Sequence, residues 1–262
     1  MDIDLTGMRA VVCGSTQGIG RASAIELANL GANITLVARN QKMLEQVKKE
    51  LESGSDQDHH LLVVDFSQPN ELKKELVEYL ADISRVDILV NNTGGPPVGR
   101  VIDAALEEFE DAFSQHLICN QIITQQVTPL MIKNGYGRII NIISTSVKMP
   151  IPGLGVSNTI RGAVANWSKT LSMELGQHGI TVNNILPGAT MTGRLKSILE
   201  QRAIKTSKTY EEVKNQMIAE IPAGRISEPQ EVANAVAFLA SPAASYINGI
   251  NVPVDGGRTG SL

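Results

Sequence analysis

The chain has 262 residues and a formal net charge of −4, which suits a single α/β domain with a sizeable core. It has no long basic run and no apolar run of membrane-spanning length, so we expect neither a nucleic-acid nor a membrane partner. Its cysteines, Cys13 and Cys119, do not form the spaced set that a zinc site or a disulfide framework needs. Since the start at Met1 also lacks a signal peptide, we expect a cytoplasmic protein without a bound metal.

Apolar, β-branched runs alternate with helical stretches along the chain. Most runs are continuous rather than interrupted by polar residues, which is typical of strands buried on both faces. We predict about seven parallel strands, at Ala10–Cys13, Ile34–Val37, Leu61–Val64, Ile88–Val90, Ile139–Ile143, Val182–Leu186 and Ile250–Val254. Predicted helices include Gln41–Glu52, Glu71–Ala81, Leu106–Lys133 and Arg161–Leu175. The alternation predicts one Rossmann-type, doubly wound α/β domain over residues 1–262.

A glycine-rich turn follows the first predicted strand and precedes a helical pattern that stops at Gly31. Its residues are Cys13-Gly14-Ser15-Thr16-Gln17-Gly18-Ile19-Gly20. Glycines allow the backbone to approach a diphosphate, and the following helix offers free N–H groups and a positive dipole end. The turn therefore predicts a phosphate cradle. The alternative is a turn that needs glycine only for its tight geometry.

The segment from Thr190 to Ile221 interrupts the alternation, because it is long and charged and contains no strand. Two helical patterns lie between Pro187-Gly188 and Pro222. An insertion after the carboxyl end of a strand lies at the edge of the sheet where ligands bind. We interpret residues 190–221 as a helical substrate lid. The alternative is a surface pair of helices without a gating role.

Further motifs follow the glycine turn in a fixed order. They are Ala38-Arg39-Asn40, Asp65-Phe66, Asn91-Asn92-Thr93-Gly94-Gly95, Gly137 to Ser144, Pro187-Gly188 and Val254-Asp255-Gly256-Gly257. Together they resemble the short-chain dehydrogenase/reductase family over nearly the whole chain. The block from Arg225 to Gly249 resembles the 3-oxoacyl-carrier-protein reductase branch. The resemblance implies a nicotinamide dinucleotide bound across the carboxyl edge of the sheet.

Arg39 argues for NADP(H) over NAD(H) as the cofactor. An NAD site needs a carboxylate after the second strand to accept from the ribose 2′-OH, whereas Ala38 and Arg39 stand there. A guanidinium offers paired donors to a 2′-phosphate. The alternative is a solvated arginine at the start of a helix.

The resemblance assigns the remaining cofactor contacts. Asp65 would accept from the adenine amino group, and Phe66 would lie beside the ring. Asn91 is expected to brace neighbouring strands instead. The other implied contacts are Asn92, Thr93 and Gly94 along the adenosine ribose and the approach to the nicotinamide, and Thr190 and Thr192, after Pro187-Gly188, at the nicotinamide amide or the diphosphate.

The resemblance also implies a catalytic serine, a tyrosine thirteen residues later, a lysine four residues after that, and an asparagine in the preceding helix. The serine is Ser144, but the other positions hold Ser157, Arg161 and His116. No tyrosine precedes the helix Arg161–Leu175 at a usable distance; the one Tyr-x-x-x-Lys spacing, Tyr210 to Lys214, falls in the segment from Thr190 to Ile221. A serine hydroxyl is a far weaker acid than a phenol, so the usual proton donor is missing.

Three other residues are candidates to stabilise the oxyanion or to donate the proton. Arg161 can bond the nicotinamide ribose and stabilise an oxyanion, but it cannot relay protons. His116 is the one residue among them that titrates near neutrality, so it is a candidate to supply the proton directly or through water. The alternative is a histidine hydrogen-bonded in the core. Lys148 is a second candidate donor, with a solvated loop lysine as its alternative.

Two functions remain open from the sequence. The first is an NADP(H)-dependent oxidoreductase acting on a small molecule, either a carbonyl or alcohol or an activated double bond. The second is an inactive dinucleotide-binding scaffold or sensor, which would explain the missing acid directly. We favour the enzyme, partly by family analogy. The resemblance also implies a homodimer or homotetramer that pairs through Leu106–Lys133 and Arg161–Leu175.

Overall fold

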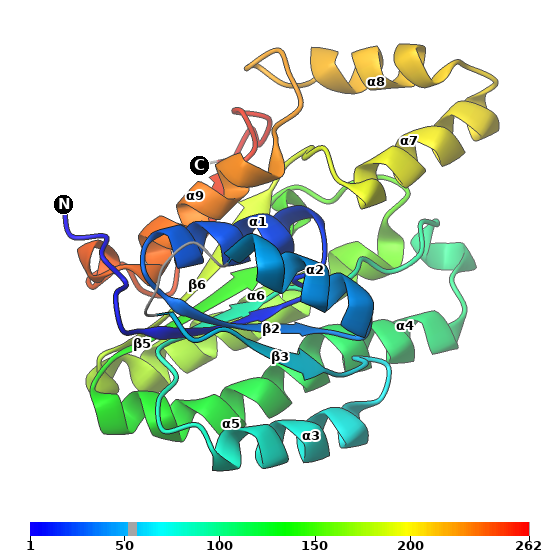
Figure 1. Cartoon of the computed structure of the whole chain (residues 1–262). Helices are drawn as coiled ribbons and strands as arrows, with labels where there is room; N and C mark the ends of the chain where they lie inside the picture. The colour runs from blue at the N-terminus through cyan, green and yellow to red at the C-terminus, as the bar shows by residue number, and fades with distance from the viewer. Residues whose placement is uncertain (52–56, 262) are drawn as a thin grey trace.

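A single parallel sheet forms the centre of the computed structural model, which describes residues 1–51 and 57–261 (Figure 1). Its strand order is β3-β2-β1-β4-β5-β6-β7. The bounds are β1 Arg9–Cys13, β2 Asn33–Ala38, β3 His60–Val63, β4 Ile88–Asn91, β5 Gly137–Ile142, β6 Ile180–Pro187 and β7 Asn251–Val254. The seven predicted strands and the Rossmann-type fold are confirmed.

The strand order reverses beside β1. The chain passes from β1 through β2 to β3 at one edge, and then returns to β4 on the other side of β1. Val11 of β1 accordingly pairs with Thr35 of β2 and with Leu89 of β4. Loops after β1 and β4 diverge at such a reversal, and open α/β sheets bind ligands there.

Two helical layers cover the sheet (Figure 1). The layer on one face consists of α1 Gly18–Asn29, α2 Gln41–Leu51 and α9 Pro229–Ala240; that on the other consists of α3 Pro69–Ala81, α5 Cys119–Asn134 and α6 Gly155–Leu175. Successive strand residues point to opposite faces, so Val12 joins the first core while Val11 and Cys13 join the second. Glu52, the predicted end of the helix from Gln41, lies outside the described residues.

The predicted helix Leu106–Lys133 is interrupted. The structure has α4 Leu106–Phe113, a π-helical turn at Ser114–Ile118, and then α5. A π turn inserts one extra residue into the helical ladder, and such turns are frequent at functional sites. The helix predicted from Arg161 also differs, because α6 begins at Gly155.

The insertion after β6 is helical, as predicted, and it stands apart from the two layers (Figure 1). It contains α7 Gly193–Thr206 and α8 Tyr210–Ala219. These helices have a small core of their own, made of Ala189, Leu195, Leu199, Ala203, Val213, Met217, Ile221 and Ile226. Thr192 and Thr209 cap them by accepting backbone N–H groups. No helix in the described part of the chain is long and apolar enough to cross a membrane.

Candidate active site

The glycine turn is built for close backbone approach. Gly14 and Gly18 have φ values of +59° and +56°, a region that L side chains rarely adopt. A Cβ on Gly20 would lie 2.2 Å from the carbonyl oxygen of Gly14. The following helix α1 has no side-chain cap from Gln17 and no acidic residue in its first turn. Its N–H groups and positive dipole end are therefore left for an anion.

Two polar side chains hold this turn in place. Ser15 is fully buried, and its hydroxyl donates to Val37 O at 3.4 Å. Asn92, which follows β4, donates through Nδ2 to the carbonyl oxygens of Cys13 and Gly14, each at 3.3 Å. Asn91 lies on β4 and donates to Asn141 Oδ1 of β5 at 2.9 Å, so its predicted bracing role is confirmed.

Two charged side chains, Arg39 after β2 and Asp65 after β3, lie close together. The side chain of Arg39 is 77% exposed, and its Nη1 lies 3.8 Å from Asp65 Oδ2. The backbone N–H of Ser67 donates to Asp65 Oδ1 at 2.9 Å and lowers the pKa of that carboxyl, and Arg39 lowers it as well. A hollow of about 610 Å³ opens at Arg39, Asn40, Gln41, Lys42 and Glu45, where α2 begins.

The start of the helical insertion after β6 meets the glycine turn. A Cβ on Gly18 would lie 3.1 Å from Cγ2 of Thr192. Gly188, after Pro187 at the end of β6, donates through its N–H to Val254 O at 2.9 Å. Thr190 is buried and its hydroxyl is already bonded, because it accepts from Ser227 Oγ at 3.0 Å.

The structure brings Ser144, Ser157 and Arg161 to the same edge of the sheet. Ser144 follows β5, and its Oγ accepts from Ser146 N at 3.1 Å. Ser157 and Arg161 are four residues apart, so they share one face at the start of α6. Arg161 is 8% exposed, and Nη1 donates to Ile142 O at 3.0 Å. Burial, and then the charge of Arg194, lower the pKa of Arg161 to about 10.

His116 lies in the π turn and is only 2% exposed. Its Nδ1 shares a hydrogen bond with Thr93 Oγ1, in the loop after β4. Burial lowers the pKa of His116 to about 2, and the positive charge of Arg161 acts in the same direction. The interpretation of His116 as a donor that titrates near neutrality is therefore wrong, and the alternative of a histidine hydrogen-bonded in the core fits, since the imidazole stays neutral at physiological pH.

Not every predicted site residue has a partner at the site. Gly94 is exposed, and a Cβ there would meet nothing within 4 Å. Phe66 accepts from Cys119 Sγ through its carbonyl oxygen at 3.2 Å. Lys148 ends a short 3₁₀ turn and has no ion pair among the described residues. Among the described residues, no group of three or more His, Cys, Asp or Glu side chains is placed to hold a metal ion.

Arg194 also reaches this edge, although no motif in the sequence predicts it. It lies in the first turn of α7, and its Nη2 donates to Pro96 O in the loop after β4. A Cβ on Gly95 would lie 3.1 Å from its Nε. The only available signal was a cation directly after Thr192-Gly193 at the start of the lid.

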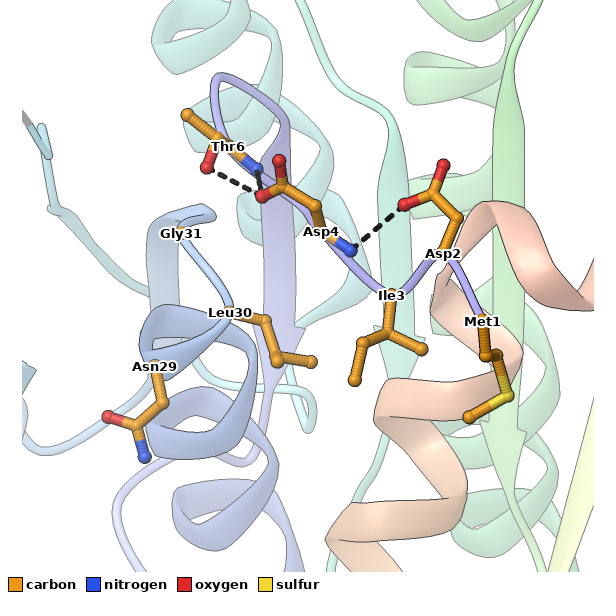
Figure 2. Close-up of a pocket in the computed structure, with 8 residues that line it drawn as sticks. All are labelled: Met1, Asp2, Ile3, Asp4, Thr6, Asn29, Leu30 and Gly31. Carbon is orange, nitrogen blue, oxygen red and sulfur yellow. Dashed lines mark hydrogen bonds between the residues drawn. The ribbon is translucent and has the colours of Figure 1, made fainter.

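Another hollow, of about 470 Å³, lies away from this edge (Figure 2). It is lined by residues 1–4, Thr6 and the end of α1 at Asn29–Gly31, which lie where β1 begins. Asp4 Oδ1 accepts from the backbone N–H and the hydroxyl of Thr6, so this carboxylate serves the local turn (Figure 2). The hollow is separate from the residues around Ser144.

The comparisons with known proteins agree with this arrangement. A family model described as enoyl-(acyl carrier protein) reductase matches residues 14–259. The NADPH-dependent reductase BacG of Bacillus subtilis is 31% identical over 254 residues, which cover 97% of this chain and 98% of that protein. The chain belongs to the short-chain dehydrogenase/reductase family. Membership places it among the oxidoreductases.

Further members of the short-chain dehydrogenase/reductase family match along their full length. The 3-oxoacyl-[acyl-carrier-protein] reductase FabG of Aquifex aeolicus is 31% identical over 257 residues, 98% of this chain and 99% of that one. The crystal structure of L-sorbose reductase from Gluconobacter frateurii, complexed with NADPH and L-sorbose, superimposes with a TM-score of 0.93 at 28% identity, covering 100% of both chains. The resemblance read from the ordered motifs is confirmed.

Proposed function

We propose that this protein is an NADP(H)-dependent oxidoreductase that transfers hydride to or from a small molecule without a catalytic tyrosine. The observation that carries the proposal is the glycine turn, which Asn92 holds against the uncapped start of α1. That arrangement suits a dinucleotide diphosphate. The lid begins directly beside it, at Thr192.

The preference for NADP(H) rests on Arg39. This exposed guanidinium lies beside Asp65 at the hollow where α2 begins, and Lys42 lines the same hollow. Two cations at a helix start suit the 2′-phosphate of NADPH. BacG and L-sorbose reductase, which are named or solved with NADPH, support the same choice.

Hydride transfer needs the cofactor and the substrate in line, which binding can supply. As hydride reaches a carbonyl or an activated double bond, negative charge develops on an oxygen. Arg161 stays protonated and, with the Ser144 hydroxyl, can stabilise that oxygen. Because His116 is neutral, we propose that water supplies the proton. Losing a dedicated general acid costs roughly 10²- to 10⁴-fold in rate. We therefore propose an activated double bond as the preferred substrate, because its reduced product can be protonated by solvent.

A scaffold or sensor without turnover is the second candidate. The buried, neutral state of His116 favours it, because neither this residue nor Ser157 replaces the missing acid. Cofactor binding alone does not distinguish the oxidoreductase from the scaffold, because both bind the dinucleotide. Turnover of NADPH distinguishes them.

The first experiment is a calorimetric titration of the purified protein with NADPH and, separately, with NADH. Tight binding of NADPH and weak binding of NADH support the cofactor proposal, and no binding of either rejects it. The second experiment follows NADPH consumption with a panel of ketones and enones. Activity of the native protein supports the enzyme. Activity with ketones only after the double change Ser157→Tyr and Arg161→Lys rejects a carbonyl reductase.

We also propose that the protein pairs with a second copy through α5 and α6. Apolar side chains remain partly exposed on these helices, with Ile132 at 41% and Met173 at 69%. A sedimentation experiment that detects only monomer rejects this pairing. Cys13 and Cys119 are free, buried thiols, which suits the reducing cytoplasm in which we propose that the protein acts.

A further inference from the structure

Two arginines flank the loop after β4. On one side, Arg194 of the lid donates to Pro96 O, and its guanidinium lies against Gly95. On the other side, the same loop pairs with the start of α6: Gly99 N donates to Gly153 O at 2.8 Å, and Gly155 N donates to Gly99 O at 3.0 Å. Arg161 lies on α6 two turns after this contact. The loop after β4 therefore lies between Arg194 and helix α6, which carries the buried Arg161.

Hydrogen bonds and charge connect the two sides. The loop residue Thr93 is bonded to His116. The charge of Arg161 acts on His116, and the charge of Arg194 acts on Arg161. Arg161 is bonded to Ile142 O at the end of β5, and Arg194 is bonded to Pro96 O in the loop after the neighbouring strand β4, so both cations lie at the carboxyl edge of these two strands.

Neither arginine is neutralised by a carboxylate in the described part of the chain. Among residues 1–51 and 57–261, no carboxylate lies within ion-pair distance of Arg161 or Arg194. Within that same set, Arg161 has one hydrogen bond, to a neutral carbonyl, although it is 8% exposed. A guanidinium that is buried beside a second cation, with no carboxylate to offset its charge, is costly, and an anion bound between them removes that cost.

We propose that Arg194 and Arg161 bind a carboxylate of the substrate, so that the physiological substrate is an unsaturated or oxo acid. This inference rests on the proposed function. The diphosphate of the cofactor is the other anion that can reach the lid. It already has the N–H groups at the start of α1, on the Thr192 side of the lid, whereas Arg194 contacts Gly95 and Pro96. A guanidinium also matches a carboxylate with two parallel donors.

Arg194 is the residue to test, because Arg161 also serves the proposed oxyanion. The variant is Arg194→Gln. The matched control is Arg202→Gln, since Arg202 lies exposed on the same helix and has no ion pair among the described residues. Each protein is loaded with NADP⁺ and titrated calorimetrically with 2-oxo acids, 2-enoic acids and the neutral primary amide of each acid. The affinity for NADPH is measured for every protein.

The native protein and Arg202→Gln are expected to bind at least one acid about tenfold or more tightly than its amide, as suits a charge-assisted pair. Arg194→Gln is expected to lose that discrimination while its NADPH affinity stays within about twofold. The inference is overturned if amides bind as tightly as acids throughout the panel. It is also overturned if Arg194→Gln weakens NADPH and leaves the discrimination intact, since Arg194 then serves the diphosphate. No NADPH binding by the native protein instead rejects the proposed function itself.

Discussion

His116 gives a prediction whose size follows from its surroundings. The change is His116→Gln, which keeps a polar side chain in the π turn but removes the titrating group. In the folded chain the pKa of His116 is lowered from 6.5 to about 2, mainly by burial. Between these two values the unfolded chain binds a proton that the folded chain does not. The free energy of unfolding must therefore fall as the pH drops below about 6.5.

The size of the loss in unfolding free energy depends on how far the pH falls below the pKa of His116 in the unfolded chain. Between the folded and unfolded pKa values, each pH unit changes the free energy of unfolding by about 1.4 kcal/mol. Protonation of His116 in the unfolded chain should therefore lower the free energy of unfolding by roughly 2 kcal/mol between pH 7 and pH 5. His59 has a lowered pKa too, but it is present in both proteins and cancels in the difference. The variant should therefore lose about 2 kcal/mol less than the native protein over this range.

The assay is urea unfolding of the native protein and His116→Gln at several pH values from 7 to 5, with His178→Gln as a second histidine control. The quantity compared is the change in unfolding free energy with pH, not its absolute value, because His116→Gln also removes the hydrogen bond to Thr93. Parallel pH profiles for native protein and variant would refute the reasoning. They would mean that His116 titrates alike in both states, and it would again be a candidate proton donor.

Three further changes test the cofactor site and the lid. Gly20→Ala should abolish tight NADPH binding in calorimetry, because its Cβ would lie 2.2 Å from Gly14 O; Gly162→Ala, where nothing lies within 4 Å, is the control and should bind normally. Arg39→Ala should weaken NADPH about tenfold and leave NADH nearly unchanged, since only NADPH has the 2′-phosphate; equal losses for both would contradict the assignment. Leu199→Ala should lower the free energy of unfolding by about 2–5 kcal/mol, because this side chain is fully buried in the lid core. Ile204→Ala, at an 82% exposed position of the same helix, should cost less than about 0.5 kcal/mol, and similar losses for the two would argue against a packed lid.

The geometry of the glycine turn could be predicted because local sequence carries its signal. The glycine turn has glycine at the two positions with positive φ, and Gly20 is required by its distance to Gly14. The bracing role of Asn91 was also predicted, and its bond to Asn141 confirms it. Whether Arg39, Ser144 and Arg161 act as proposed stays a prediction.

The sequence by itself determined the architecture. Continuous apolar runs such as Ile139–Ile143 can be buried on both faces only within a layered sheet, and the intervening helical stretches supply the layers. The helical insertion could be predicted because Thr190 to Ile221 breaks this alternation, whereas its role as a lid stays a prediction. These features depend on residue type and short-range spacing, which a sequence displays directly.

Only the tertiary structure decided the electrostatics of the site. No proline or glycine marks the π turn at Ser114–Ile118, so the interruption of the predicted helix Leu106–Lys133 is seen only in the folded structure. His116 is neutral because elements distant in the sequence bury it, and Arg194 of α7 reaches the loop after β4 because the chain folds so that its side chain bonds Pro96 O. Burial and distance set pKa values and charge pairing, and both arise from contacts between segments that no local pattern specifies.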